Sequence, residues 1–160
     1  MNKTMTASLL ALLATATTVS VAAQEQAPQT SESTAELIYS GEDLTPGESI
    51  NGELQAIHPQ MDDGTHADCF QLHPRAGAEY TVTLRSEDFD SYLLVGVGSC
   101  ADVLVQFEND DFEDESLDSQ VVFAAEYDLY SVYVNTYNPG ATGAYTLSVE
   151  HRMLPLPGAD

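Results

Sequence analysis

An acidic stretch at residues 108–118 is the part of the sequence that most directly suggests chemistry, because it carries seven carboxylates in eleven positions. Calcium in proteins is bound by six to eight oxygen atoms, mostly carboxylates and carbonyls at close spacing on a loop. Residues 108–111 follow an apolar run and are expected to form a turn, which a second acidic turn at residues 88–90 approaches. The candidate calcium ligands are therefore Asp88, Asp90, Asn109, Asp110 and Asp111.

The same stretch also has an interpretation without a metal. It lacks the ligand spacing and the glycine of an EF-hand loop. Asn109 and Asp110 are short polar residues of the kind that cap backbone amides in turns, and residues 112–118 would then form a solvated acidic loop. Calcium is thus a candidate cofactor of this chain, and the sequence requires none.

The histidines and the carboxylate pairs match no pattern of a transition-metal site or of an active site. His58, His66 and His73 stand near several aspartates, but their spacing fits no zinc-binding pattern. The chain contains no G-x-S-x-G, no H-E-x-x-H and no glycine-rich phosphate loop. A pair such as Asp110 and Asp111 is expected by chance in so acidic a chain. We therefore expect no catalytic residues and no enzymatic activity.

Three tyrosines are candidates for a binding surface. An exposed tyrosine suits contacts with glycans or proteins, because its ring is apolar and its hydroxyl is polar. Tyr133 and Tyr137 are expected on an outward face or in the final turn, and Tyr92 near another edge. The alternative is that these rings pack at the edges of the fold and leave only their hydroxyls in water.

The first 23 residues have the pattern of a secretory signal peptide. Lys3 supplies a positive start, the apolar run after it is too short to span a bilayer, and small residues precede an expected cleavage before Gln24. A membrane anchor is the alternative, but no cysteine near the cleavage site could take a lipid. We expect an exported protein, periplasmic or secreted and without membrane insertion, that starts with a flexible polar leader at residues 24–36.

The charge balance narrows the classes of partner. Removal of Lys3 with the signal peptide would lower the net charge from −22 to −23 and leave three arginines against 26 acidic residues. Such a surface repels nucleic acid and anionic lipid. It fits metal ions or cationic partners, or a saline habitat in which carboxylates keep the protein hydrated.

The two cysteines, Cys69 and Cys100, are predicted to form a disulfide. An exported chain with an even number of cysteines favours a bond, since an exposed thiol would oxidise outside the cell. The closed loop of about 30 residues would contribute roughly 3 to 4 kcal/mol by the chain-entropy argument. A catalytic thiol and a metal ligand are the alternatives.

Alternation of apolar and polar residues predicts β-strands. Tyr80, Val82 and Leu84 fall on one face of a strand, and Phe70 and Leu72 do so in another. Two more continuous apolar runs, SYLLVGV and QVVFAA, are expected to be central strands. Turn residues separate the runs at spacings near ten.

This pattern predicts a single domain. We expect an all-β fold, an antiparallel, jelly-roll-like β-sandwich of eight or nine short strands, over residues 37–150. The proline-rich residues 151–160 are expected to leave the fold as a tail.

The order of these pieces resembles the bacterial pre-peptidase C-terminal domain. That domain is a small β-sandwich found beside the catalytic domain of many secreted proteases, including clostridial collagenases. The resemblance runs from about Ile50 to Val149, and its most specific pieces are SEDFDSYLLV, the following NDD and the closing GATGAYTLSV. Phe70 and Leu72 fill the core positions of the family's D-x-Y-x-F pattern, and Cys69 is an addition.

The resemblance implies a fold and a type of role. This chain shows no peptidase domain, so the resemblance implies a non-catalytic accessory module, which would recognise an extracellular polysaccharide or a partner protein. Some relatives bind calcium, so the alternative is a calcium-stabilised structural module with no recognition role.

Overall fold

The computed structural model describes residues 41–113 and 116–155, and this part of the chain holds eight β-strands and no helix. The signal peptide and leader predicted for residues 1–36 lie outside it. No helix in these ranges is long and apolar enough to cross a membrane. The strands are β1 Ser49–Leu54, β2 Ala67–Leu72, β3 Ala78–Arg85, β4 Ser91–Ser99, β5 Asp102–Asn109, β6 Ser119–Ala124, β7 Tyr130–Thr136 and β8 Gly143–Met153.

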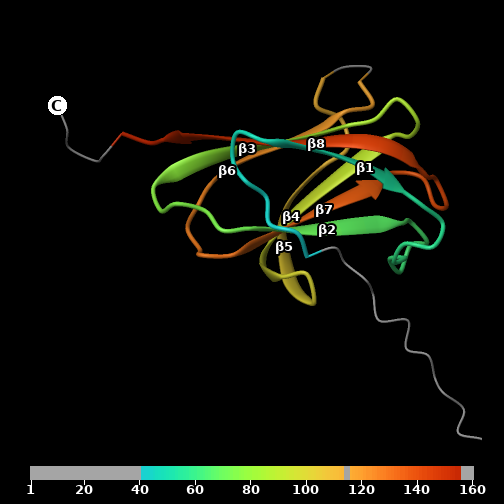
Figure 1. The fold of residues 1–160 in the computed structure, drawn as a ribbon, viewed down its shortest axis with the longest axis horizontal. Coiled ribbons are helices and arrows are strands. Elements are labelled where there is room, and N and C mark those ends of the chain that lie inside the picture. The colour runs from blue at the N-terminus through green and yellow to red at the C-terminus, as the bar shows by residue number, and fades with distance from the viewer. Residues whose placement is uncertain (1–40, 114–115, 156–160) are drawn as a thin grey trace, which may run out of the picture. The chain divides into compact units, whose positions relative to one another are not determined.

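Two antiparallel four-stranded sheets make up the fold, in the strand orders β1-β8-β3-β6 and β2-β7-β4-β5 (Figure 1). The predicted antiparallel β-sandwich is therefore confirmed. Its core lies between the sheets and follows from the period of two, because alternate side chains of each strand point inward. Phe70, Leu72, Tyr80, Val82 and Leu84, which the sequence placed in the core, are all at most 3% exposed.

The position of one apolar run was predicted wrongly. SYLLVGV forms β4, which is central as expected, but QVVFAA falls in β6, which is an edge strand with β3 as its only neighbour. Val121 and Phe123 face the core, whereas Val122 points outward and is 50% exposed. An apolar run indicates a buried strand only when both of its faces are covered, and β6 is covered on one.

Strand β8 continues past the predicted end of the domain. It pairs with β3 as far as Met153, opposite Ala78, so residues 151–153 belong to the sheet and not to the tail. Two contacts hold this end: His151 stacks on Tyr80 with ring centroids 5.6 Å apart, and Arg152 Nη2 lies 2.6 Å from Glu79 Oε1. The two prolines that suggested a tail, Pro155 and Pro157, follow Met153, the last residue of β8 that pairs with β3.

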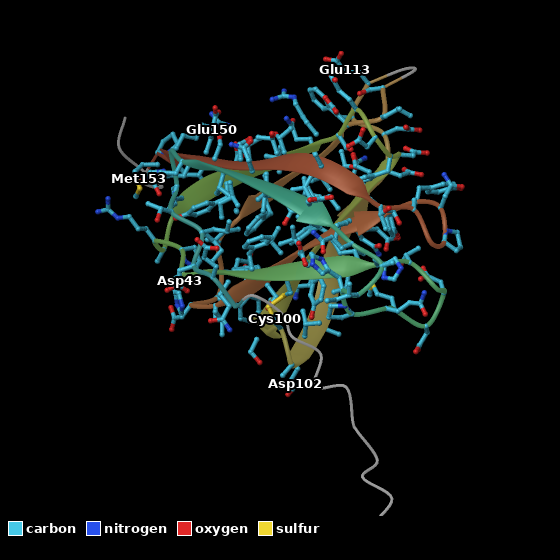
Figure 2. The ribbon with its side chains drawn as sticks, turned by 45° about the vertical axis from the view of Figure 1, so that its right-hand side comes forward. Asp43, Cys100, Asp102, Glu113, Glu150 and Met153 are labelled. Carbon is cyan, nitrogen blue, oxygen red and sulfur yellow. A yellow bond between two sulfur atoms is a disulfide. The ribbon has the colours of Figure 1, made fainter. Side chains whose placement is uncertain are left out.

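The predicted disulfide is present. Cys69 of β2 and Cys100, at the turn after β4, are bonded, with their Cα atoms 5.9 Å apart (Figure 2). They lie on the outer face of their sheet in a second apolar cluster with Ala67, Leu94 and Tyr133. Met61, from the loop between β1 and β2, packs against this cluster. That loop therefore covers part of a sheet face that alternation alone would leave in water.

Candidate functional site

Three strands meet at the end of the sandwich that carries the acidic stretch. Strand β4 begins there, and its antiparallel neighbours β5 and β7 end there, since Ser91 lies opposite Thr136 and Leu93 lies opposite Asn109. The first residues of one strand and the last residues of two others therefore project into the same region. The loop between β1 and β2 adds a fourth segment.

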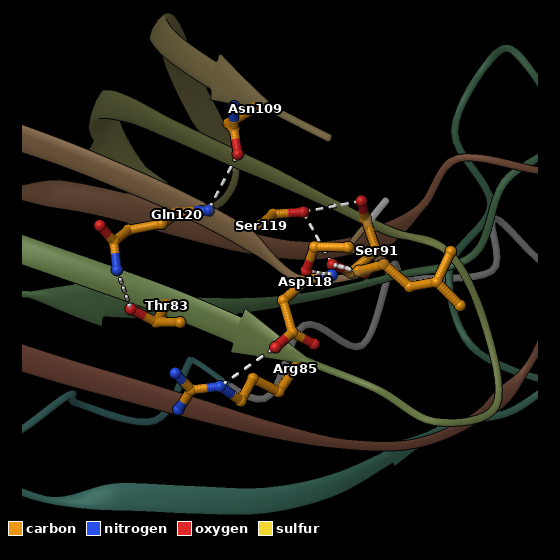
Figure 3. A network of polar contacts seen from close by, with 9 residues as sticks. Thr83, Arg85, Ser91, Asn109, Asp118, Ser119 and Gln120 are labelled. Atoms are coloured by element: carbon orange, nitrogen blue, oxygen red, sulfur yellow. Dashed lines mark hydrogen bonds and ion pairs between the residues drawn. The ribbon is translucent and has the colours of Figure 1, made fainter. Parts of the chain in front are cut away.

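A network of polar contacts fixes the start and end of the acidic loop (Figure 3). The Asn109 side chain accepts a hydrogen bond from the Gln120 amide at 2.9 Å, and the Gln120 side chain donates to Thr83 at 3.0 Å. The Ser119 hydroxyl donates to the Ser91 carbonyl at 2.7 Å, which ties β6 to β4. Arg85 pairs with Asp118 at 3.1 Å.

These contacts use Asn109 as a turn residue. Besides accepting from Gln120, its side-chain amide donates to the Asp111 carbonyl at 3.0 Å. Both ends of the side chain are therefore engaged, as in the alternative interpretation in which Asn109 caps a turn. The bond to β6 uses one of the two lone pairs of its amide oxygen.

Asp88 lies apart from the acidic stretch. Its carboxylate accepts a hydrogen bond from the Ala144 amide at 2.8 Å, and it lines a different hollow together with Asn51, Arg85 and Thr146. The structure thus does not gather the five predicted calcium ligands at one point. In residues 41–113 and 116–155, no group of three or more His, Cys, Asp or Glu side chains is arranged to hold a metal ion.

Asp90, Asp110 and Asp111 do interact electrostatically. Burial raises the pKa of Asp90, and the charges of Asp111 and Asp110 raise it further. The Asp90 Oδ1 atom is shielded from solvent and has no hydrogen-bond partner in the part of the chain that the structure describes. Such an atom carries a desolvation cost that nothing in its surroundings offsets.

The three converging strands and the loop enclose a pocket of about 390 Å³. Its lining combines two of the predicted surface tyrosines with residues of the acidic stretch, and we call it the tyrosine–carboxylate pocket. It is lined by Asp63, Tyr92, Glu108, Asn109, Asp110, Thr136 and Tyr137.

Hydrogen bonds hold several side chains of this pocket in place. The Tyr92 hydroxyl donates to Glu108 Oε2 at 2.8 Å. Asp63 Oδ1 accepts from both the hydroxyl and the backbone amide of Thr65, at 2.7 Å and 3.0 Å. The amide of Tyr137 donates to the Asp90 carbonyl at 2.9 Å, which anchors the exposed Tyr137 ring beside the acidic residues.

The pocket is electrically negative. The pKa of Tyr92 is raised to about 12, first by burial, then by the hydrogen bond to Glu108, and then by the charges of Glu108, Asp110 and Asp63. The bonds from Thr65 lower the pKa of Asp63 and so keep it ionised. Three carboxylates, two from the acidic stretch and one from the loop between β1 and β2, therefore act on one ring.

The third predicted surface tyrosine is placed elsewhere. Tyr133 is 3% exposed, and its hydroxyl donates to the Cys100 carbonyl at 2.8 Å within the second apolar cluster. It does not lie on a binding surface, because Met61 and the disulfide hairpin cover the sheet face from which it projects.

The histidines serve local structure in this fold. His58 Nδ1 lies 2.9 Å from Asp68 Oδ1, and Tyr145 donates to the other oxygen of Asp68 at 2.7 Å. His73 lies 3.5 Å from Asp43 on the exposed surface. His58 and His73 thus lie in two separate pairs with aspartates.

Thr136 and Asp63 are pocket residues that the sequence did not indicate as members of a site. Asp63 lies in the loop between β1 and β2, 45 positions before Glu108, and its sequence position does not predict that it lies near the acidic stretch. Its place follows from the hydrogen bonds that fold this loop back, such as Met61 to Thr65 at 2.9 Å and Ala67 to Pro59 at 3.0 Å. Its only sequence signal is the D-G-T turn, which indicates a turn and not its neighbours.

Comparison with known proteins shows a likeness to solved structures. No family model matches this chain, and no curated protein does. Among solved structures, it is similar to the pre-peptidase C-terminal domain of collagenase from Bacillus anthracis, with 19% sequence identity and a TM-score of 0.47. The match covers 68% of this chain and 93% of that one.

Proposed function

We propose that this chain is an exported, non-catalytic accessory module that binds an extracellular polymer or a partner protein through the tyrosine–carboxylate pocket. The observation that carries the proposal is the convergence of Tyr92 and Tyr137 with three carboxylates in one pocket. Aromatic rings beside fixed polar groups are typical of recognition sites, since the rings bury area and the polar groups set specificity.

Export is supported by two independent features. The first 23 residues have the composition of a signal peptide. The Cys69–Cys100 bond fits an oxidising compartment, where structural disulfides form and persist. The resemblance to a pre-peptidase C-terminal domain implies an accessory role beside an enzyme, and it implies no proteolysis by this chain.

A polymer-capture experiment tests this function. The exported chain would be mixed with insoluble collagen, cellulose and chitin, and the protein lost from solution would be measured. We expect one polymer to deplete the wild type and Tyr137→Ala to bind about fivefold more weakly, as for a central aromatic contact. Tyr127→Ala is the matched control, because Tyr127 is 49% exposed at the opposite end of β7 and Tyr137 is 56% exposed. Equal binding by wild type and Tyr137→Ala would count against a role for the pocket.

A second candidate function is a calcium-stabilised structural module. The observation that favours it is the buried, unpartnered Asp90 Oδ1 beside Asp110 and Asp111. Calcium at 100 times its dissociation constant would add about 2.7 kcal/mol, which raises the melting temperature of a domain of this size by roughly 5 to 10 °C. The melting temperature measured in EDTA, and then with calcium, magnesium or sodium chloride, distinguishes a calcium site from general charge screening. A shift with calcium alone supports this candidate, and equal shifts with every salt indicate charge screening.

A further inference from the structure

We infer that the tyrosine–carboxylate pocket receives the cationic side chain of a lysine or arginine on a protein partner. The inference rests on the binding role proposed above and specifies the chemistry of its ligand. It selects a protein over a neutral polysaccharide. Within the described ranges, the pocket has aromatic walls, carboxylate oxygens that accept no hydrogen bond, and no cationic side chain in its lining.

The aromatic walls suit an organic cation. The face of a tyrosine ring attracts an ammonium or guanidinium group, and the alkyl stem of the side chain packs against the same ring. Tyr137 is 56% exposed and so leaves much of its ring free for such a contact, while Tyr92 is held in place by Glu108. A calcium or magnesium ion would be bound by oxygen atoms and would not need the face of either ring.

The carboxylates retain capacity to accept hydrogen bonds. Glu108 uses Oε2 for Tyr92, and Asp63 uses Oδ1 for Thr65, so Glu108 Oε1 and Asp63 Oδ2 remain without a donor in the described part of the chain. An ammonium group has three donors and a guanidinium group has five. A lysine or arginine entering between these segments could therefore satisfy more than one carboxylate at once.

Among the residues that the structure describes, no lysine, arginine or histidine lines the pocket beside these carboxylates. Arg85 pairs with Asp118, and Arg152 pairs with Glu79 in the sheet that does not contribute to the pocket. Asp90 adds an independent sign of missing positive charge, because its Oδ1 is buried without a donor and its carboxylate interacts with Asp110.

The size of the pocket distinguishes a side chain from an ion. A volume of about 390 Å³ lies in the range of pockets that enclose small organic groups, and it is much larger than one metal ion needs. The net charge of −22 over the whole chain would also draw a basic partner toward the molecule from a distance. Anionic partners and nucleic acid are disfavoured by the same field.

A peptide titration tests the inference. The probes are four flexible Gly-Ser peptides that differ at one central residue: lysine, arginine, norleucine or citrulline. The exported chain is titrated at 0.15 M salt, where exposed charges act over only about 8 Å, and amide resonances are followed by NMR. We expect the lysine and arginine peptides to shift the resonances of residues 136 and 137, and the two uncharged peptides to leave them unchanged.

Two variants and two matched controls localise the binding. Tyr137→Leu and Asp110→Asn should each weaken binding of the lysine peptide about fivefold or more, because the first removes an aromatic face and the second removes a negative charge from the pocket lining. Tyr127→Leu and Glu150→Gln make the same chemical changes outside the pocket and should leave the affinity unchanged. Equal weakening by a variant and its control would mean general attraction to an acidic surface and would overturn the inference.

The remaining outcomes separate this inference from the proposed function. Binding of the norleucine peptide as tight as that of the lysine peptide would overturn the cationic ligand while leaving a pocket that binds. Displacement of the lysine peptide by calcium, with calcium affinity unchanged in Tyr137→Leu, would also overturn it in favour of a metal site. Tyr137-dependent capture of cellulose or chitin without lysine-peptide binding would retain the proposed function and reject this inference alone.

Discussion

The Tyr92 hydroxyl on β4 donates to the Glu108 carboxylate on β5 across 2.8 Å, and this bond joins two features that looked separate in the sequence. Tyr92 belonged to the candidate binding surface, and Glu108 opened the acidic stretch. Because β4 starts at the end of the sheet where β5 finishes, the two features form a single pocket. The acidic stretch is therefore hydrogen-bonded to a tyrosine and does not only face solvent.

Loss of this bond should cost measurable stability. We expect Tyr92→Phe to lower the free energy of unfolding by about 0.5 to 1 kcal/mol, the value for an ordinary hydrogen bond and less than that for a buried charged acceptor, because Glu108 is exposed. Urea unfolding at pH 7 measures this as a lower midpoint with an unchanged m-value. Tyr137→Phe is the control and should change little, since the Tyr137 hydroxyl has no partner among the described residues. Equal effects of the two variants would contradict the role of the bond.

Alkaline pH should reduce the difference in the free energy of unfolding between the wild type and Tyr92→Phe. The pKa of Tyr92 is about 12 in the folded protein, against 10.0 for an ordinary tyrosine. The neutral phenol is thus favoured by folding, so its contribution is complete below pH 10 and is lost as the pH rises toward 12. Urea midpoints of both proteins at pH 8 and pH 11 check this. A difference between them that stays constant over this range would mean that the Tyr92 pKa is not raised.

Asp90→Asn should stabilise the protein at neutral pH. Burial and the neighbouring acids raise the Asp90 pKa above 3.8, so the stability linked to its protonated form is present below that pH and is lost as the pH rises through the folded value. At pH 7 the charge opposes folding, and an uncharged amide should gain about 0.5 kcal/mol, the scale of one partly exposed charge interaction.

Thermal melts in EDTA check this prediction. Asp90→Asn should melt at a higher temperature than the wild type at pH 7, and the two should melt at the same temperature at pH 3. Asp128→Asn removes a charge from the exposed turn before β7 and serves as the control. If Asp90→Asn instead destabilises the protein in calcium and EDTA abolishes the difference, the calcium-stabilised module becomes the better description.

Removal of the disulfide should lower stability by about 3 to 4 kcal/mol. The bond spans 31 positions, and a loop of this length restricts the unfolded chain by about that amount. We expect the double variant Cys69→Ala, Cys100→Ala to unfold at a lower urea concentration. A reducing agent should destabilise the wild type and leave the variant unaffected. A reductant effect on the variant as well would show that the change in wild type does not come from this bond.

Sequence reasoning located the elements and the covalent link well. Alternation placed Tyr80, Val82 and Leu84 on one inward face, and the compartment argument paired Cys69 with Cys100. Both inferences rest on local properties. The side chains of a strand alternate between its two faces wherever the strand lies in the fold. Two cysteines of an exported protein form a disulfide when the fold brings them close together. Asn109 also behaves as the turn-capping alternative described.

The errors came from relationships between strands. A period of two says which residues share a face, but it says neither which strand is at an edge nor what covers an outer face. Val122 is exposed and lies on the edge strand β6, whereas Tyr133 is buried in an apolar cluster on the outer face of its sheet, against which Met61 packs. Asp88 and Asp90 are two positions apart, yet a hydrogen bond to β8 holds Asp88 at a different hollow.

The sequence by itself determined the all-β class, the inward faces of the strands, the disulfide and the strongly acidic surface, since each depends on composition or on nearest neighbours. Only the tertiary structure decided the tyrosine–carboxylate pocket. Asp63, Tyr92, Glu108 and Tyr137 come from four segments, and they meet because antiparallel β4, β5 and β7 share one end and a folded loop approaches it. Strand order is set by packing between sheets, which no single segment of the sequence encodes.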